Sequence, residues 1–190
     1  MVGKNVKTSE RRNVKTSECR HVATSKQLSV ATVETALATV TDPEIPVINI
    51  LEMGIVAGVR IAEGRVVVAL TPTFAACPAV DVIREETRRA VSSVFSGPIE
   101  VKIVYDPPWT SDRITEEGRR KLKAFGLAPP HAACGNDAAT AGATRPLGQV
   151  PCPYCDSTNT ELESLFGPTL CRSIHYCRAC LQSFEQFKDV

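Results

Sequence analysis

The chain has 190 residues, of which 43% are hydrophobic, 23% charged and only 5% aromatic, with a formal net charge of +1. These proportions predict a globular protein with an aliphatic core, and no apolar run approaches the roughly 18 residues that a membrane span needs. The N-terminus lacks the apolar segment of a secretory signal, so we expect a cytoplasmic protein.

The first 28 residues contain a tandem repeat of eight residues, NVKTSERR, NVKTSECR and HVATSKQL. A period of eight fits neither a helix nor a strand, and the units have nothing with which to form a core. We therefore predict a disordered basic tail over residues 1–28, with an arm for an acidic partner or nucleic acid as the alternative. The remainder is slightly acidic, which argues against a broad nucleic-acid surface.

Structure is predicted to begin at Ser29, the N-cap of a helix whose apolar face carries Val30, Val33, Leu37 and Val40. Pro43 must end that helix, because proline disfavours helical geometry in the residue before it. The segment IVAGVRIAEGRVVVALTP, residues 55–72, then predicts a β-hairpin that turns at residues 62–64.

A helix follows Pro78, then the strand PIEVKIVY and a closing helix that ends at Gly126. The order α-β-β-α-β-α over residues 29–127 predicts a small α+β domain with one mixed sheet under helices. Residues 128–150 are rich in Ala, Gly, Pro and Thr and indicate a linker. We expect this linker to separate the domain from a second core in residues 151–190.

Five of the eight cysteines lie in the last 40 residues, and four of them form two C-x2-C pairs, CPYC and CRAC. Two such pairs supply four thiolates for one tetrahedral ion, which would provide the folding energy that a 40-residue module lacks. We therefore predict a zinc ribbon with a closed structural site, and a rubredoxin-like iron as the alternative. The expected ligands are Cys152, Cys155, Cys177 and Cys180.

The fifth cysteine of this module, Cys171, is interpreted as a buried apolar residue, with a substitute ligand as the alternative. His175 is interpreted as a strand residue rather than a ligand. Three short strands are expected in the ribbon, in TELESLFG, SIHYC and SFEQFK.

A lone cysteine, Cys77, stands in TPTFAACPAV between the predicted hairpin and the helix that follows. With Pro78 at the first helical position, Cys77 is expected at the N-cap or beside it, where unpaired N–H groups would stabilise a thiolate. A compact residue in a tight turn is the alternative, and the residues alone favour it. Asp42 and Glu44 are likewise either a solvated turn or carboxylates that could hold iron.

Three segments, VTDPEIPVINILEMGIV, TPTFAACPAVDVI and VKIVYDPPWTSDRITEEGRRKLKAFGLAPP, resemble the SufT-like domain of iron–sulfur cluster assembly factors. Together with the C-terminal segment that contains ESLFGPTLC and FEQFK, the chain from about residue 30 to 188 resembles the PaaD family. That resemblance implies that Cys77 and the Asp42-Pro43-Glu44 loop are the functional elements. The family often has a glycine where this chain has Ala76, which would be strained if a positive φ were required there.

The resemblance implies an accessory factor of phenylacetate degradation that helps to assemble iron or iron–sulfur centres in a phenylacetyl-CoA ring 1,2-epoxidase, a monooxygenase complex. Such a factor would be non-catalytic, would carry structural zinc and transient iron or an iron–sulfur cluster, and would act on oxygenase or reductase subunits. Neither membrane nor nucleic acid is expected as a partner, and a homodimer stays open. The alternative is a zinc-ribbon binding module or transcriptional regulator.

Overall fold

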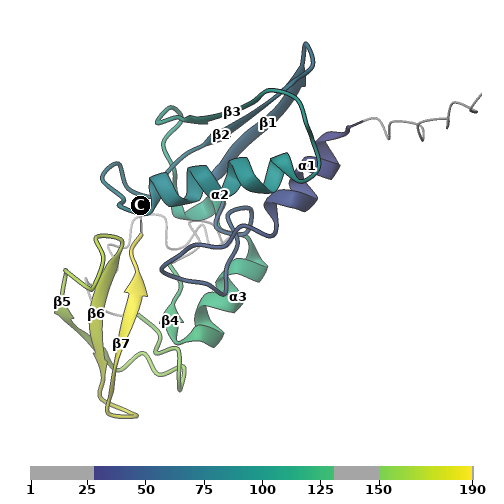
Figure 1. The fold of residues 1–190 in the computed structure, drawn as a ribbon. Coiled ribbons are helices and arrows are strands. Elements are labelled where there is room, and N and C mark those ends of the chain that lie inside the picture. Colours follow the sequence, from purple (N-terminus) through teal and green to yellow (C-terminus); the bar gives the residue numbers. More distant parts are fainter. Residues whose placement is uncertain (1–27, 131–149, 190) are drawn as a thin grey trace, which may run out of the picture.

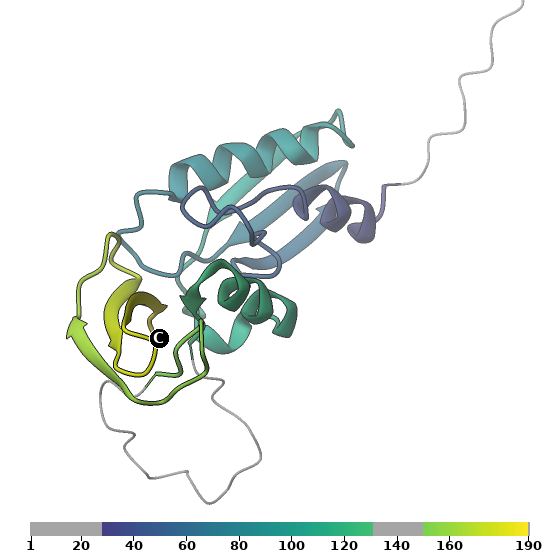
Figure 2. The same ribbon diagram turned by 90° about the horizontal axis from the view of Figure 1, so that it is seen from below.

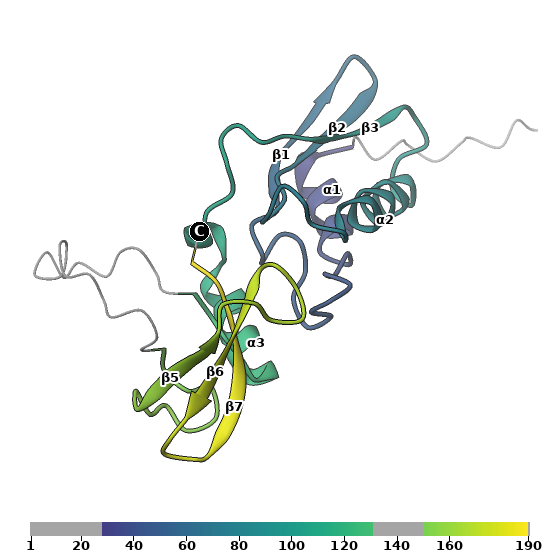
Figure 3. The same ribbon diagram turned by 90° about the vertical axis from the view of Figure 1, so that its left-hand side faces the viewer.

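In the computed structural model, residues 28–130 and 150–189 are described, and the repeats in residues 1–27 lie outside them. The first unit is a three-stranded sheet in the order β1-β2-β3, in which β2 is antiparallel to β1 and parallel to β3. Helices α1 and α2 lie side by side on one face of this sheet (Figures 1 and 3). The elements are α1 (Val30–Leu37), β1 (Val56–Ala62), β2 (Arg65–Leu70), α2 (Val80–Ser92), β3 (Ile99–Ile103), the 3₁₀ turn η1 (Ser111–Arg113) and α3 (Glu116–Phe125).

Local sequence signals account for most of these boundaries. The Ser29 hydroxyl accepts a hydrogen bond from the backbone N–H of Thr32 at 3.2 Å, which caps α1 as predicted. Glu63 and Gly64 both have positive φ, 51° and 70°, the conformation of a two-residue hairpin turn. Gly126 ends α3 with φ 90° in the left-handed region. The predicted order of helices and strands is therefore confirmed, although Val30 is exposed.

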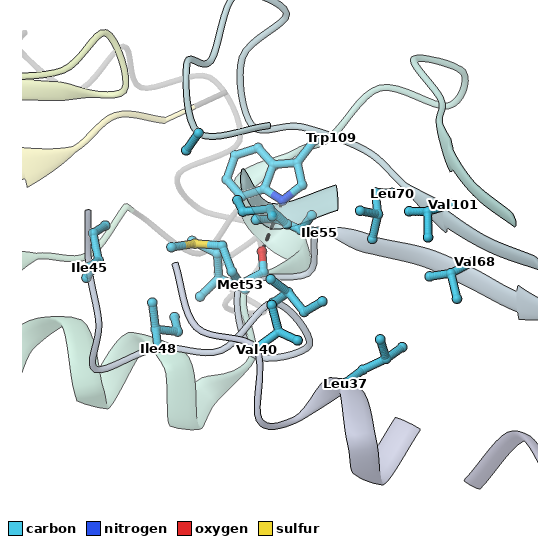
Figure 4. Close-up of a cluster of buried hydrophobic side chains, with 14 of the residues drawn as sticks. Leu37, Val40, Ile45, Ile48, Met53, Ile55, Val68, Leu70, Val101 and Trp109 are labelled. Carbon is cyan, nitrogen blue, oxygen red and sulfur yellow. Dashed lines mark hydrogen bonds between the residues drawn. The ribbon is translucent and has the colours of Figure 1, made fainter. Parts of the chain in front are cut away.

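Aliphatic residues from the sheet and from the irregular segment between α1 and β1 form the main core (Figure 4). The single tryptophan, Trp109, is buried in it, and its indole N–H donates a hydrogen bond to the Met53 carbonyl at 3.0 Å. This bond ties the segment after β3 to the turn that precedes β1. Trp109 is thus a structural residue at the end of the first unit.

The second unit is a four-stranded sheet in the order β4-β7-β6-β5. The three strands predicted for the ribbon are β5 (Thr160–Ser164), β6 (Arg172–Cys177) and β7 (Gln182–Phe187). The fourth, β4 (Leu127–Ala128), follows α3 directly and pairs in parallel with β7. Ala128 and Val150, placed in the linker on composition, are both buried in the small cluster around Cys152 and Cys177.

The prediction of two separate cores holds only in part, because the ribbon has a small cluster of its own but also contributes to the core of the first unit. Phe187 and Cys171 of the ribbon belong to the same buried cluster as the core of the first unit. The ring of Phe187 lies 5.8 Å from that of Trp109, centroid to centroid. Figure 2 shows the ribbon against α3 and the loops at one end of the sheet. The two units share this core because β7 ends in Phe187, whose ring is buried against the first unit rather than within the ribbon.

Within the described residues, no helix is both long enough and apolar enough to cross a membrane.

The shared core predicts that the two units unfold together. Replacing the buried Phe187 by alanine should lower the free energy of unfolding by about 3 to 5 kcal/mol. Denaturant unfolding followed by Trp109 fluorescence and by far-UV circular dichroism should give one coincident transition, shifted to lower denaturant.

The matched control is Phe166→Ala, because the Phe166 side chain is 71% exposed and its ring lies beneath the Lys188 ammonium. This change should cost less than about 1 kcal/mol. Two separated transitions, with Phe187→Ala shifting the ribbon alone, would show that the cores are independent after all.

Candidate functional site

The four predicted ribbon ligands converge. The sulfurs of Cys152, Cys155, Cys177 and Cys180 all lie within 4.8 Å of one another. Those of Cys152 and Cys180 are 3.7 Å apart, and those of Cys155 and Cys177 are 3.6 Å apart. A tetrahedron with metal–sulfur bonds of about 2.3 Å has edges of about 3.8 Å, so these sulfurs fit a tetrahedral ion. The four sulfurs predicted as ligands therefore lie together at the spacing of a tetrahedral metal site.

Backbone turns after each pair bring the sulfurs together. Asp156 and Leu181, the residues that follow the two pairs, both have positive φ, 58° and 60°. Their N–H groups return to the carbonyls of Cys152 and Cys177 at 2.9 and 2.8 Å. Each pair therefore forms a knuckle that points both thiols inward.

The thiols of this cluster differ in acidity. The backbone N–H of Cys180, together with neighbouring donors, outweighs burial at Cys177 and lowers the pKa of its thiol to about 6. Burial and the neighbouring thiols raise the pKa of Cys180 to about 12. An ion held by all four sulfurs must therefore displace protons, so its affinity falls with falling pH. Four sulfur ligands also close the site and leave no position for a substrate.

His175 and Cys171 were also considered as metal ligands of the ribbon, and neither belongs to the four-sulfur cluster. His175 is buried in β6, where its ring stacks on Phe184 at 5.5 Å, so it is a strand residue as predicted. Cys171 is buried as expected, but in the main core, and its thiol lies 3.1 Å from the hydroxyl of Thr169. It therefore takes no place in the four-sulfur group.

Cys77 lies in the loop between β2 and α2, and one part of its prediction is wrong. Helix α2 begins at Val80 with Ala79 as the N-cap, so Cys77 stands two residues before the cap. A turn still carries the chain from Cys77 into the helix, because the N–H of Val80 reaches the Cys77 carbonyl at 3.3 Å. The backbone N–H of Ala79 donates to the sulfur, so a donor at the helix mouth does reach it. Ala76 is not among the described residues with positive φ and is unstrained.

The aspartate of the Asp-Pro-Glu loop and the lone thiol face one pocket. Asp42 and Cys77 both line it, together with Thr73 and apolar side chains from the sheet and α2. The Asp42 carboxylate accepts hydrogen bonds from the N–H groups of Glu44 and Ile45 at 2.8 and 3.0 Å. These two bonds stabilise the conformation of the Asp-Pro-Glu loop. Glu44 does not line the pocket, but its charge acts on the thiol.

The Cys77 thiol is half-buried, and its surroundings raise its pKa, whereas the helix-mouth argument led us to expect a lowered one. Burial raises its pKa, and the charges of Asp42, Cys171 and Glu44 raise it further, while the Ala79 N–H lowers it. Like charges and a low dielectric both disfavour a second anion in the pocket. A cation bound in this pocket would offset the negative charges that disfavour the thiolate.

One residue of this neighbourhood was not predicted from the sequence. Cys171 lies 94 positions from Cys77 in the chain, yet both belong to the main core cluster, Cys171 within it and Cys77 packed against it. In the sequence, the one sign of a separate role for Cys171 was that the C-terminal module has five cysteines, whereas its ion takes four.

Removal of the ribbon metal should loosen the first unit as well, because the cores are shared. Amides of β2 should exchange with deuterium faster after chelation than before, and Cys180→Ser, which cannot close the site, should reproduce the effect. Hydrogen exchange read by mass spectrometry measures this. Unchanged protection of β2 in the chelated protein would contradict it.

The thiol of Cys77 should resist alkylation at neutral pH. In the zinc-loaded chain, iodoacetamide labelling of the peptide that contains Cys77 should have a midpoint above the ordinary thiol value of about 8.5, because its folded pKa is raised. Glu44→Gln should lower that midpoint by removing a neighbouring charge. Glu86→Gln, on the exposed side of α2, is the control. A midpoint at or below the ordinary value would overturn the assignment.

Two family models match this chain. One, described as an iron-sulfur cluster assembly protein, matches residues 30–103. The other, described as the PaaD zinc beta ribbon domain, matches residues 136–188. The first thus covers the pocket with Cys77 and Asp42, and the second covers the four-sulfur cluster and Cys171.

Three relatives show similarity to most of the chain or to about half of it. A protein of Escherichia coli, described as a subunit of a "Putative 1,2-phenylacetyl-CoA epoxidase", is 34% identical over 81% of this chain and 89% of its own length. An "Fe-S protein maturation auxiliary factor" of Porphyromonas gingivalis is 39% identical over 45% of this chain and 83% of its own. A factor of the same description from Bacillus subtilis is 35% identical over 46% and 86%. With both modules matched in order and one relative matched over nearly its whole length, the chain belongs to the PaaD family, in which an iron–sulfur assembly domain is joined to a zinc ribbon.

Proposed function

We propose that this protein is a non-catalytic accessory factor that assists the assembly of an iron or iron–sulfur centre in a phenylacetyl-CoA ring 1,2-epoxidase. The observation that carries the proposal is the meeting of Cys77 and Asp42 in one pocket at the end of the sheet. The names of the relatives supply the class of client, since one is described as part of an epoxidase and two are called maturation factors.

The chemistry of the pocket suits a transferred metal better than a substrate in turnover. A thiol whose pKa is raised by burial and by nearby carboxylates stays protonated until a cation arrives to stabilise its thiolate. Cysteine sulfur suits iron and iron–sulfur centres, while a carboxylate adds a hard ligand. Cys77 is the proposed acceptor and donor of the metal, Asp42 assists it, and Glu44 contributes negative charge from outside the pocket.

The four-sulfur site has a different proposed role. Because it is closed, we assign it zinc that stabilises the ribbon rather than metal that is passed on. The ribbon then presents the loop between β5 and β6, in which Leu165, Phe166 and Leu170 are all exposed. Three neighbouring exposed apolar side chains on one short loop suit contact with another protein. We propose that a client component of the epoxidase docks there, in the cytoplasm, next to the loop that carries Cys77.

The proposal predicts a separation of folding from function. Cys77→Ala should lower stability by no more than about 2 kcal/mol, because a small residue replaces another at a half-buried position. The same change should abolish maturation of the epoxidase. Growth of a complemented strain on phenylacetate, the iron content of the purified epoxidase and thermal melts of the variant measure the two effects.

Cys19→Ala and Cys134→Ala, whose positions lie outside the described residues, serve as controls and should leave growth and iron content unchanged. Normal growth and normal iron content with Cys77→Ala would remove the case for a functional thiol.

A further inference from the structure

Cys171 is placed by the fold at the junction between the two units rather than inside the ribbon. The ribbon has its own small core, formed around Cys152, Cys177 and Phe184, and Cys171 is not part of it. Cys171 is instead 9% exposed within the core of the first unit, against which Cys77 also packs. Figures 1 and 2 show the loop that ends at Cys171, between β5 and β6, next to the loop that leads into α2.

The neighbouring residue holds Cys171 in this place. The guanidinium of Arg172 donates to the carbonyl oxygen of Glu44 at 3.0 Å and pairs with the carboxylate of Glu185 at 2.9 Å. Its side chain is only 10% exposed, so the charge depends on these partners. The first residue of β6 is therefore bonded to the Asp-Pro-Glu loop, and Cys171, one residue earlier, belongs to the core cluster that also contains Ile45, the residue after that loop.

Both thiols lie in the field of the same carboxylates. Burial raises the pKa of Cys171, and the charges of Glu44 and Asp42 add to it while Thr169 and Arg172 lower it. The pKa of Cys77 responds to the same two carboxylates and to Cys171 itself. Groups that act on one another in this way share one low-dielectric neighbourhood, and a cation placed among them would be stabilised by all of them.

We propose that Cys171 is the second thiolate ligand of the Cys77 site, so that transferred metal is held between the two units by one sulfur from each, with the Asp42 carboxylate. This inference rests on the proposed function and adds a ligand to it. The class of ligand is a divalent first-row transition metal such as Fe²⁺, because two thiolates and a carboxylate suit it. Each thiol releases its proton to water as the metal–sulfur bond forms.

The proposed ligand atoms are not yet at metal-binding spacing in this structure, so they must move together to bind an ion. In the parts of the chain that are described, the ribbon cysteines form the one group with ligand atoms already at metal spacing. Cys77 is half-buried in a loop, whereas Cys171 is held by the strand and by Arg172. Closure would therefore move the loop of residues 71–79 toward a fixed sulfur. A ligand that must be brought in by loop movement can also be withdrawn, as transfer to a client requires.

The test uses the full-length, zinc-loaded chain with Cys19→Ser and Cys134→Ser, which leaves Cys77 and Cys171 as the two thiols outside the ribbon site. Anaerobic titration with Co²⁺ should add one ion per chain with thiolate-to-cobalt charge-transfer absorption, while the zinc content stays constant. Cys171→Ser should weaken this binding by at least about tenfold, since even loss of an outer-shell partner of a metal costs that much. Its charge-transfer absorption should fall in proportion to the sulfur lost. Leu170→Ala, which shortens an exposed side chain next to Cys171 without touching its sulfur, is the matched control and should bind Co²⁺ normally.

A second measurement needs no change in the core. Phenylarsine oxide bridges two thiols only where they can approach each other, with the release of one water, and should link Cys77 to Cys171 in a single peptide pair by mass spectrometry. Undiminished Co²⁺ binding by Cys171→Ser, or no bridged pair, would overturn the inference. If Cys77→Ser loses the ion while Cys171→Ser keeps it, the proposed function stands without the second thiol. If the background chain takes up no Co²⁺, the metal role of Cys77 fails as well.

Discussion

The buried guanidinium of Arg172 is the contact on which the arrangement of the two units depends. A charge with so little exposure must be matched, and its partners come from β7 of the ribbon and from the Asp-Pro-Glu loop of the first unit. Removing the Glu185 carboxylate would leave an uncompensated charge in a low dielectric, which costs several kcal/mol. The packing of Phe187 near Trp109 supplies the apolar part of the same junction. The orientation of the ribbon, and with it the position of Cys171, follows from these contacts.

The chain uses cysteine in two opposite ways. In the ribbon, turns with positive φ at Asp156 and Leu181 force four sulfurs together, and nothing further can enter once an ion is bound. At the end of the sheet, Cys77 lies outside this cluster and is half-buried, and burial and nearby carboxylates raise its pKa. The first arrangement favours permanent occupancy. The second is the one to which we assign uptake and release of a metal in the proposed function.

Local patterns predicted the elements well, because the physics behind them is local. The Ser29 cap, the turn at Glu63 and Gly64 and the stop at Gly126 each involve neighbours in the chain. The C-x2-C pairs belong to the same class, since each knuckle closes on itself. The start of α2 was misplaced by two residues, because Pro78 is compatible with the first turn of a helix and equally with the tight turn that precedes it.

The sequence by itself determined the two modules, the order of their elements and the four sulfurs of the ribbon, since spacing along the chain encodes all of these. Only the tertiary structure decided that the modules share a core and that Cys171 lies in the neighbourhood of Cys77. The acidity of Cys77 was also decided there, because the N-cap argument considered the helix alone and not the burial and carboxylates that oppose it. The physical reason is the same throughout. Burial and charge act through space, between residues that no local pattern connects.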